Sequence, residues 1–468
     1  MNRKTVSGIM LTLLLLGMLM LAFNIQLIQA APRTWCVDDD GGADFSSIQQ
    51  AINSASPGDT VFVHSGTYYE HVRVNKSLSL IGENRSTTVI DGYTFGTVVQ
   101  VTADDVLINE FTIQNGWWGV YLCGTQNCSI AENVIRNNEY RYIGAPPDFE
   151  LIIVPPGRGI WLYESKNNRI IENTLNNNHR GISLEYSNSN SVVGNVVLSS
   201  TLSWGIFLEV SHDNTICNNL VKHSTYDGIY LVVSEKNNII RNSVMNNGDE
   251  GIYLGMANNN VIIGNNVKNN PGDGIMLDGS DGNTVVENTV TNNGKRGIAL
   301  WMAKDNTIYH NNFIDNAWGQ ACSSQINLWD DSYPSGGNYW SDYTGVDEKS
   351  GVNQDQPGSD GIGDTPYTIY LNNQDRYPLV ESWSIPTMIN NLIRTIRFWN
   401  LPKGTENSLT SKLNDVIHLF DAGNENGAVH KLMDIIDQVE TLREKKLTDE
   451  QADYLAAEAQ RIKDLIQR

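Results

Sequence analysis

The chain has 468 residues, of which 18% are charged and 40 are Gly. Its 53 acidic and 32 basic residues leave a formal net charge of -21, which argues against a nucleic-acid partner because phosphate recognition needs a basic face. Aromatic residues make up 9% of the chain and exclude wholesale disorder, and five Cys in this length exclude a disulfide scaffold.

Residues 1–31 are predicted to be a secretory signal. Arg3 and Lys4 precede an apolar run over residues 9–23, and small residues follow at Ala30–Ala31. This order of basic, apolar and small residues is typical of a cleaved signal peptide. An uncleaved N-terminal anchor is the alternative, since a longer reading of the apolar run could span a bilayer. In both cases we expect a secreted, cell-surface or periplasmic protein.

A short helix is predicted at the start of the remaining chain. Five apolar residues share one helical face before the turn at Pro57–Gly58, and they are Phe45, Ile48, Ala51, Ile52 and Ala55. We expect this helix to cover the open end of the repeat structure that follows, where unpaired strand edges would otherwise promote aggregation.

A repeat of 22 to 24 residues fills the middle of the chain and is clearest over residues 96–320. Each unit begins with a glycine, which in all but the last unit precedes an apolar residue. These glycines are Gly119, Gly159, Gly181, Gly205, Gly228, Gly251, Gly274, Gly297 and Gly319. The first spacing is longer than the others and contains an insertion near Glu139–Gly157. Repetition at a fixed period predicts a solenoid, in which each unit buries its apolar edge against its neighbours.

Three positions in each unit define the predicted coil. The first residue after the glycine is Val or Ile and the third is Leu in all eight units before Gly319, so both are predicted to face the core from one strand. The fourteenth residue is always Asn, whose amide can hydrogen-bond its own coil and the next. The predicted structural ladder consists of Asn133, Asn173, Asn195, Asn219, Asn242, Asn265, Asn288 and Asn311.

This pattern predicts an all-β parallel β-helix over residues 32–383, with coils stacked about 4.8 Å apart. A leucine-rich repeat has a similar period and is the main alternative. The Asn- and Gly-rich remainder of each unit contains no helix-forming segment, which argues against that alternative.

Several segments resemble known β-helix families. Residues 41–45 and 58–61 resemble the opening of many right-handed β-helix proteins. Ser335–Tyr343, with Asp360–Tyr367 and Asp375–Leu379, resembles the closing pattern of the NosD-like periplasmic β-helix family. The resemblance implies a right-handed helix and a surface or periplasmic protein with the carbohydrate-binding and sugar-hydrolase type of repeat. It does not by itself imply an activity, because one fold hosts many functions.

From the resemblance to the NosD-like family, we expect residues 321–383 to form a C-terminal loop region of the β-helix. The name-giving members of that family assist copper-site maturation of nitrous oxide reductase. The eight His residues of this chain are scattered, and no cluster of Cys, His and Met has a spacing suited to copper. Copper-site maturation therefore ranks third among the possible functions, after glycan binding and polysaccharide cleavage.

The composition changes after a linker predicted over residues 384–400. Residues 401–468 show three apolar stripes at helical spacing, and Thr448 with Gln451 forms a capping box before the last stripe. We therefore expect a small three-helix domain. The span 401–448 resembles the FIMAH-type helical module found at the C-termini of secreted proteins. We expect it to tether the chain or to bind another surface protein.

The second and fourth residues after each glycine are predicted to point outward. Those proposed to bind a substrate are Trp161, Tyr163, Phe207, Tyr230 and Tyr253. An exposed aromatic ladder beside carboxylates suits a sugar chain, because ring faces stack on pyranose C–H groups. The alternative is that the rings of neighbouring strands stack only on one another.

A column of acids precedes the glycines of three consecutive coils, and it consists of Asp227, Glu250 and Asp273. Carboxylates about 4.8 Å apart repel one another unless something neutralises them. We therefore add these residues to the predicted ligand site, where a bound cation would also fit. The alternative is a solvated turn with screened charges.

The Gly-rich closing loop contains a second candidate site, for Ca²⁺. Its oxygen ligands would come from Asp355, Asp360, Asp364 and Asp375. Acidic loops with Gly at the bends suit Ca²⁺, although this spacing is not that of an EF-hand. No other cofactor is indicated.

Glu185 and Glu209, one coil apart, are weak catalytic candidates, because glycoside hydrolysis needs two carboxyl groups about 5–10 Å apart. Repeats create such neighbours by chance. The chain lacks the Gly-His-Gly and Asn-Thr-Asp motifs typical of polygalacturonases, and no Ser-His-Asp or Cys-His nucleophile set is evident. Cys123 and Cys128 lie in one coil and are candidates for a disulfide.

The sequence thus favours a surface β-helix protein that binds a polysaccharide or cell-surface glycan along an exposed strand face, without catalysis. Adhesion or a surface-layer role would follow from such binding. The first alternative is a polysaccharide lyase or glycoside hydrolase, in which the carboxylate columns would act as acid and base.

Overall fold

The computed structural model describes residues 31–139, 157–370 and 372–467. The predicted signal over residues 1–31 lies almost entirely outside these ranges, as does most of the insertion near Glu139–Gly157. The helices within them are all too short or too polar to cross a bilayer.

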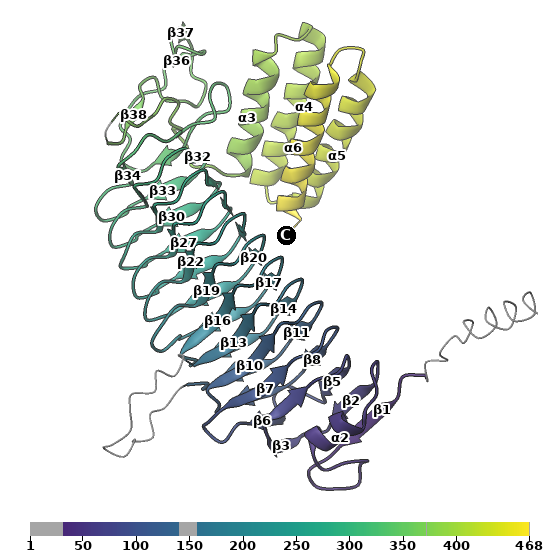
Figure 1. Cartoon of the computed structure of the whole chain (residues 1–468). Coiled ribbons are helices and arrows are strands. Elements are labelled where there is room, and N and C mark those ends of the chain that lie inside the picture. The colour runs from purple at the N-terminus through teal and green to yellow at the C-terminus, as the bar shows by residue number, and fades with distance from the viewer. Residues whose placement is uncertain (1–30, 140–156, 371, 468) are drawn as a thin grey trace, which may run out of the picture.

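The described residues form a parallel β-solenoid of about 13 turns, followed by a helical bundle beside its C-terminal end (Figure 1). Each coil contributes one short strand to each of three long sheets, called here A, B and C. The prediction of a parallel β-helix with a C-terminal helical domain is confirmed.

Sheet A contains 12 strands among the described residues. They are β1 (Thr34–Val37), β2 (Thr60–Val63), β5 (Ser79–Gly82), β8 (Leu107–Asn109), β11 (Ser129–Ala131), β14 (Arg169–Ile171), β17 (Ser191–Val193), β20 (Thr215–Cys217), β23 (Asn238–Ile240), β26 (Val261–Ile263), β29 (Thr284–Val286) and β32 (Thr307–Tyr309).

Sheet B follows sheet A in each coil. Its strands are β3 (Gly66–Tyr69), β6 (Thr88–Asp91), β9 (Thr112–Gln114), β12 (Val134–Arg136), β15 (Thr174–Asn176), β18 (Val196–Leu198), β21 (Leu220–Lys222), β24 (Ser243–Met245), β27 (Asn266–Lys268), β30 (Thr289–Thr291), β33 (Asn312–Ile314) and β35 (Tyr339–Trp340).

Sheet C closes each coil. Its strands are β4 (Val72–Val74), β7 (Thr97–Val101), β10 (Trp118–Cys123), β13 (Arg158–Tyr163), β16 (Arg180–Glu185), β19 (Ile206–Glu209), β22 (Ile229–Val232), β25 (Ile252–Gly255), β28 (Ile275–Asp278), β31 (Ile298–Trp301) and β34 (Ala321–Ser323).

Register pairs equivalent residues of successive coils. In sheet C, Ile229 pairs with Ile252 and Leu231 with Leu254, and all four side chains are fully buried. Because side chains two apart share a face of a strand, this register stacks like on like along the core. The residues between them necessarily point outward, which builds the columns considered below.

Asn side chains connect the coils at the corner between sheets A and B. Asn242 is typical: its Nδ2 donates to the Ile216 carbonyl at 2.8 Å and to Asn265 Oδ1 at 3.0 Å. Its own Oδ1 accepts the Asn219 backbone N–H at 3.0 Å. Each amide therefore satisfies backbone groups that the turn would otherwise leave buried without partners.

Two further Asn ladders lie at the other corners of the solenoid. One precedes sheet A and includes Asn214 and Asn237, where the Asn214 N–H donates to Asn237 Oδ1 at 2.9 Å. The other follows sheet B and includes Asn247 and Asn270, joined in the same way at 3.0 Å. The polar interior of the solenoid is thus confined to its corners, and the apolar core lies between them.

Both ends of the solenoid are covered. At the N-terminal end, α2 (Ile48–Ser54) is capped by Ser47 and buries the side chains of Ile48, Ala51 and Ile52, so the predicted capping helix is confirmed. At the other end, loops carry the hairpins β36 (Lys349–Ser350) with β37 (Gln356–Pro357) and β38 (Tyr367–Thr368) with β39 (Gln374–Asp375).

The C-terminal loops also end the first Asn ladder. The Asn338 N–H donates to Asp375 Oδ2 at 2.7 Å, and Trp340 Nε1 donates to the same oxygen at 2.9 Å. A carboxylate suits the last rung because it only has to accept hydrogen bonds. Complete burial raises the pKa of Asp375 to about 7, against the backbone and indole N–H groups that lower it.

The helical bundle has four helices within the described residues, one more than predicted. They are α3 (Ile385–Phe398), α4 (Lys403–Asp421), α5 (Glu425–Leu442) and α6 (Asp449–Ile466). Most of the segment predicted as a linker over 384–400 is α3. Ser384 caps this helix and a Pro lies in its first turn, and both are start signals of a helix. The prediction of an irregular linker over this segment is therefore wrong. The predicted capping box of Thr448 and Gln451 opens α6.

The bundle packs directly on the solenoid. The Trp383 ring stacks on the His310 ring with centroids 3.6 Å apart, and the Trp383 backbone N–H donates to Asn312 Oδ1 at 2.6 Å. From α6, Arg461 forms an ion pair with Glu287 beside sheet A. Ile362 and Leu379 of the loops join the same buried apolar cluster as α3.

Candidate functional site

The outward face of sheet C concentrates aromatic and charged side chains. Residue pairing places the second residues after each glycine in one column, with Tyr121 beside Trp161, Phe207 beside Tyr230, and Tyr230 beside Tyr253. Ser183 interrupts this column between Trp161 and Phe207. The strands therefore present two aromatic groups, one on each side of β16.

The rings of this column stack on one another. The Tyr230 and Tyr253 rings are 4.8 Å apart with an interplanar angle of 2°, and the Tyr121 and Trp161 rings are 4.4 Å apart. Trp204 adds a further ring, stacked on Phe207 at 4.9 Å. Mutual stacking uses the ring faces, so the column presents mainly ring edges and hydroxyl groups to solvent.

Two of the predicted binding residues are buried rather than exposed. Trp161 is 8% exposed and Phe207 is 4% exposed. The Arg158 guanidinium lies 4.0 Å from the Trp161 ring centroid, and the Arg180 guanidinium lies 4.5 Å from that of Phe207. Trp161 and Phe207 were predicted to be exposed because they point outward from the strands. The arginines cover their rings through cation–π packing.

Other aromatic side chains beside the column are exposed. Tyr186 is 49% exposed, Tyr226 50%, Trp301 42% and Trp318 65%. Trp301 belongs to the outward column of fourth residues, but Tyr186 and Tyr226 lie in turns that the repeat analysis did not single out. The Arg296 guanidinium lies 5.9 Å from the Trp301 ring centroid and 5.7 Å from that of Trp318, and the exposed parts of these four rings and of the partly exposed Tyr163 can contact a ligand.

Glu185 is held in a buried ion pair. Its Oε1 lies 2.5 Å from Arg158 Nη2 and 3.4 Å from Arg180 Nη1. Burial lowers the pKa of Arg158, and the Glu185 carboxylate opposes that effect. Glu209 pairs in register with Glu185, so the two catalytic candidates are neighbours, but the carboxylate of Glu185 is already used by two guanidinium groups.

The acidic column has its own internal cation. Asp227, Asp249 and Glu250 offer oxygens that all lie within 4.8 Å of one another. Lys295 Nζ, from two coils further along, lies 3.1 Å from Glu250 Oε1 and 3.5 Å from Asp249 Oδ1. This ammonium neutralises much of the repulsion expected between the coils. Asp249 was not a predicted site residue, and neither was Lys295.

Asp227 is the most perturbed member of the column. It is 5% exposed, and its two oxygens accept hydrogen bonds from Trp204 Nε1 at 3.1 Å and from the Glu250 N–H at 2.8 Å. Burial raises the pKa of Asp227, and the adjacent Glu250 raises it further. Asp273, in the next coil but one, accepts the Arg296 N–H at 2.8 Å instead of joining the cluster.

The four candidate calcium ligands do not converge. Asp375 is buried and ends the Asn ladder, whereas Asp364 accepts the backbone N–H groups of Glu348 and Lys349. Asp360 accepts the Ile362 N–H, and Asp355 accepts from the Gln356 amide. Each carboxylate organises its own turn.

The donor groups present do not suit copper. Within residues 31–139, 157–370 and 372–467, the groups of three or more neighbouring His, Cys, Asp or Glu side chains are Asp38–Asp40 and the Asp227 cluster, and both are purely carboxylate. Copper favours imidazole and sulfur donors. Cys123 and Cys128 do not form the predicted disulfide.

Family comparisons agree with this architecture. Residues 148–345 match the family described as periplasmic copper-binding protein (NosD), and residues 81–197 match the right-handed β-helix region. Residues 387–464 match the FIMAH domain. The chain carries NosD-type right-handed β-helix and FIMAH domains. The FIMAH match begins inside α3, in accord with a bundle of four helices.

The chain is also similar to a curated relative, a cell surface glycoprotein of Methanothermus fervidus, with 32% identity over 96 residues. That match covers 20% of this chain and 16% of the relative, so the chain spans about a sixth of the relative's length.

Among solved structures, the NosD-type β-helix is similar to the Dettilon tailspike protein, with 18% identity, a TM-score of 0.47, and coverage of 67% of this chain and 64% of the other. It is similar to the periplasmic alginate epimerase AlgG, with 18% identity, a TM-score of 0.42, and coverage of 60% and 71%. A GH87 α-1,3-glucanase catalytic domain gives 13% identity, a TM-score of 0.45, and coverage of 64% and 69%.

Proposed function

We propose that the chain is a cell-surface or secreted protein that binds polysaccharide along the outward face of sheet C without cleaving it. The observation that carries this proposal is the alignment of exposed rings and hydrogen-bonding groups along that face. The exposed Tyr226 ring lies 6.1 Å from that of Trp204, and Tyr253 Oη donates to Asp278 Oδ2 at 3.1 Å. Rings that stack on C–H faces beside carboxylates that accept hydroxyl protons are a suitable lining for a sugar chain.

The length of the face favours a polymer over a small molecule. From β10 to β31 the face crosses seven coil steps, a distance of about 34 Å at the usual strand spacing. A surface of this length can contact several successive sugar units. Many weak contacts in a row provide affinity through their number.

The charge of the face indicates which polymers it accepts. Around β22 to β28, the four carboxylates of Asp227, Asp249, Glu250 and Asp273 outnumber the nearby cations Lys295 and Arg296. With a chain charge of -21, this region disfavours a polyanion. We therefore expect neutral polysaccharides to bind this face better than polyuronates do.

Affinity electrophoresis through gels that contain soluble neutral polysaccharides tests the proposal. Tyr226→Ala combined with Trp301→Ala removes two exposed rings, and retardation should weaken by about tenfold in apparent affinity. Tyr370→Ala is the matched control, because Tyr370 is 62% exposed and lies between β38 and β39, outside the strands of sheet C. Equal retardation of the original chain, the double variant and Tyr370→Ala would refute binding at this face.

One observation favours a second candidate function, acid catalysis. Burial and the adjacent Glu250 raise the pKa of Asp227, which favours the protonated carboxyl group, and glycosidases use such a group as their general acid. Mass spectrometry of polysaccharides incubated with the chain distinguishes the two functions. Shortened chains that disappear with Asp227→Asn would establish catalysis, whereas intact polymers support binding alone.

A further inference from the structure

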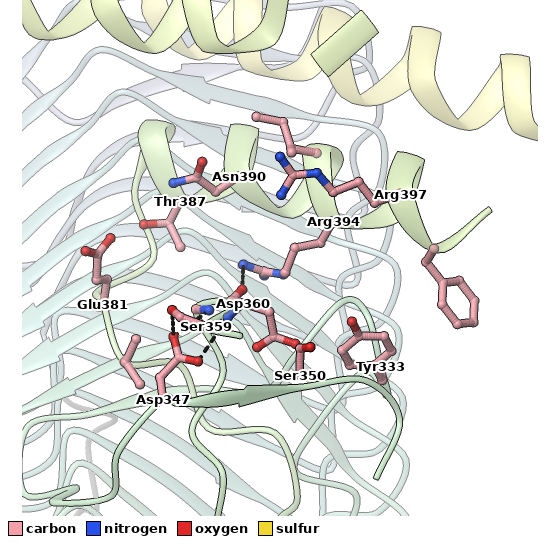
Figure 2. Close-up of a pocket in the computed structure, with 14 residues that line it drawn as sticks. Tyr333, Asp347, Ser350, Ser359, Asp360, Glu381, Thr387, Asn390, Arg394 and Arg397 are labelled. Carbon is pink, nitrogen blue, oxygen red and sulfur yellow. Dashed lines mark hydrogen bonds between the residues drawn. The ribbon is translucent and has the colours of Figure 1, made fainter. Parts of the chain in front are cut away.

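A cavity of about 620 Å³ lies between the closing loops of the solenoid and α3 (Figure 2), and no residue of the sheet C strands lines it. We call it the junction cavity. The loop side carries Asp347, Ser350 and Asp360, and the helix side carries Asn390, Arg394 and Arg397. Its volume is in the range of small-molecule sites, and its mostly polar lining suits a polar ligand.

The helix side is cationic because of residue spacing on α3. Asn390, Arg394 and Arg397 are separated by four and three residues, so they share one face of the helix. Figure 2 shows this face turned toward the loops. Two guanidinium groups therefore line one cavity.

Arg394 carries a buried charge without a carboxylate partner. It is 8% exposed, and three of its N–H groups donate to the Pro334 carbonyl at 3.3 Å, the Asp360 carbonyl at 3.1 Å and Asn391 Oδ1 at 3.4 Å. All three acceptors are neutral. Burial lowers the pKa of Arg394, and the nearby carboxylates of Asp360 and Asp347 offset part of that effect without forming a direct ion pair with it among the described residues. A guanidinium has five N–H donors, so two remain for a ligand.

Arg397 supplies a second, accessible guanidinium. It is exposed, and among the residues that the structure describes it forms no ion pair. Phe398 follows it and is 51% exposed, and the Tyr333 ring lies 5.7 Å from that of Phe398. This end of the cavity thus combines a free cation with two aromatic rings.

The carboxylates of the loop side are largely occupied. Asp347 accepts from Ser359 Oγ at 2.6 Å and from the N–H groups of Asp360 and Gly361 at 2.9 and 2.7 Å. Burial raises the pKa of Asp360, which favours its neutral form. Glu381 is exposed and lies at the opposite end of the cavity from Arg397 (Figure 2).

The junction cavity is therefore polarised, with donors and rings at one end and an acceptor at the other. We propose that it binds a saccharide residue that carries a carboxylate or a sulfate group. The oxyanion would lie against Arg394 and Arg397, the sugar ring against Tyr333 and Phe398, and the hydroxyl groups toward Asn390 and Glu381. Guanidinium groups bind such oxyanions with two parallel hydrogen bonds. This site is separate from the sheet C face and does not depend on the proposed function.

Calorimetric titration of the purified chain tests the inference. The probes are a galacturonic acid trimer, N-acetylglucosamine 6-sulfate, maltotriose as the neutral sugar, and sodium sulfate as the bare ion. We expect one site per chain for one or both acidic sugars, at least about tenfold tighter than for maltotriose. The carboxylated and sulfated probes distinguish the two oxyanions.

Variants locate the site. Arg397→Gln should weaken binding of the acidic sugar about tenfold or more, and because Arg397 is exposed the fold should be unaffected. Arg169→Gln, an exposed arginine in β14 of sheet A, should bind like the original chain. The Tyr226→Ala and Trp301→Ala double variant should also bind normally, which separates this result from that of the sheet C face.

Three outcomes would overturn the inference. The first is no binding of either acidic sugar, and the second is unchanged affinity in Arg397→Gln. The third is sodium sulfate that binds as tightly as the sulfated sugar, which would reduce the cavity to a site for an adventitious ion.

Discussion

Asn242 illustrates how one side chain stabilises this solenoid. Its amide accepts hydrogen bonds from Asn219 and donates to Ile216 and Asn265, so it joins three coils while it is only 1% exposed. Asp could not donate, and Ser could not reach both neighbours. Asn therefore occupies every inner rung of the ladder between sheets A and B, whereas the terminal Asp375 only accepts.

We expect Asn242→Ala to lower the free energy of unfolding by about 2–4 kcal/mol, because it leaves several buried backbone groups without partners. Urea unfolding followed by circular dichroism measures the change. Asn407→Ala, an exposed position in α4, is the matched control and should change stability by less than about 0.5 kcal/mol. Equal stability of the two variants would contradict a structural role for the ladder.

At the scale of residues, the sequence predicts which residues of successive coils align in columns, but not which side chains pack around them. The Asn ladder followed directly from the period, and the two further ladders recur nine and nineteen residues after the glycines, where the same analysis could have found them. The burial of Trp161 could not be predicted, because it depends on how Arg158 folds over the ring. Lys295 and Asp249 lie in turns that are two coils apart. Their contact could not be predicted, because the repeat length does not determine the backbone conformation of these turns.

At the scale of elements, His310 marks the junction between the solenoid and α3. It is 5% exposed, its ring stacks on Trp383, and its Nε2 lies 3.1 Å from the Ser335 carbonyl oxygen. Burial lowers the pKa of His310 to about 3, with Arg394 and Arg461 contributing repulsion. Neutral imidazole is therefore part of the packing between solenoid and bundle.

This packing predicts loss of stability in acid. Unfolded His takes up a proton near pH 6.5, but folded His310 does so only near pH 3, so the free energy of unfolding should fall as the pH drops from 6.5 to 3. At pH 4.5 the expected loss is about 2–3 kcal/mol. Urea unfolding at pH 7 and pH 4.5, followed by tryptophan fluorescence, measures it.

His310→Asn is the informative variant, since Asn does not titrate and tolerates the left-handed backbone at this position, where φ is 55°. The variant should be less stable at pH 7 but should lose less stability between pH 7 and pH 4.5. The same pH dependence in both proteins would assign the acid sensitivity to other groups.

Elements with a strong period were predictable, and isolated elements were not. The strands and α2 follow from apolar spacing, as do α4 to α6. By contrast, α3 was taken for a linker because Ser384 and Pro386 resemble an irregular segment, although both residues start the helix. The apolar face of α3 is completed by Ile362 and Leu379 from the solenoid loops, contacts that no local pattern contains.

At the scale of the whole molecule, the bundle and the solenoid share an interface that includes the ion pair of Arg461 with Glu287. Both side chains are partly buried. A double-mutant cycle with Arg461→Gln and Glu287→Gln should give a coupling energy of about 1 kcal/mol, and salt should reduce it. Hydrogen exchange of α6 measures the local effect. A coupling energy near zero would mean that this ion pair does not help to hold the bundle in place.

The uniform stack has a consequence for how this protein can change. Strand pairing and the Asn242 ladder join each coil to its two neighbours. One complete coil such as Gly228–Glu250 can therefore be removed or duplicated and the flanking rungs of that ladder still match, although side-chain contacts that reach two coils, such as those of Lys295, would change. A one-residue deletion, in contrast, turns a strand inside out. The length of the solenoid should therefore vary by whole coils. Each added or removed coil would lengthen or shorten the sheet C face that contacts a polymer, while α2 and the closing loops stay the same.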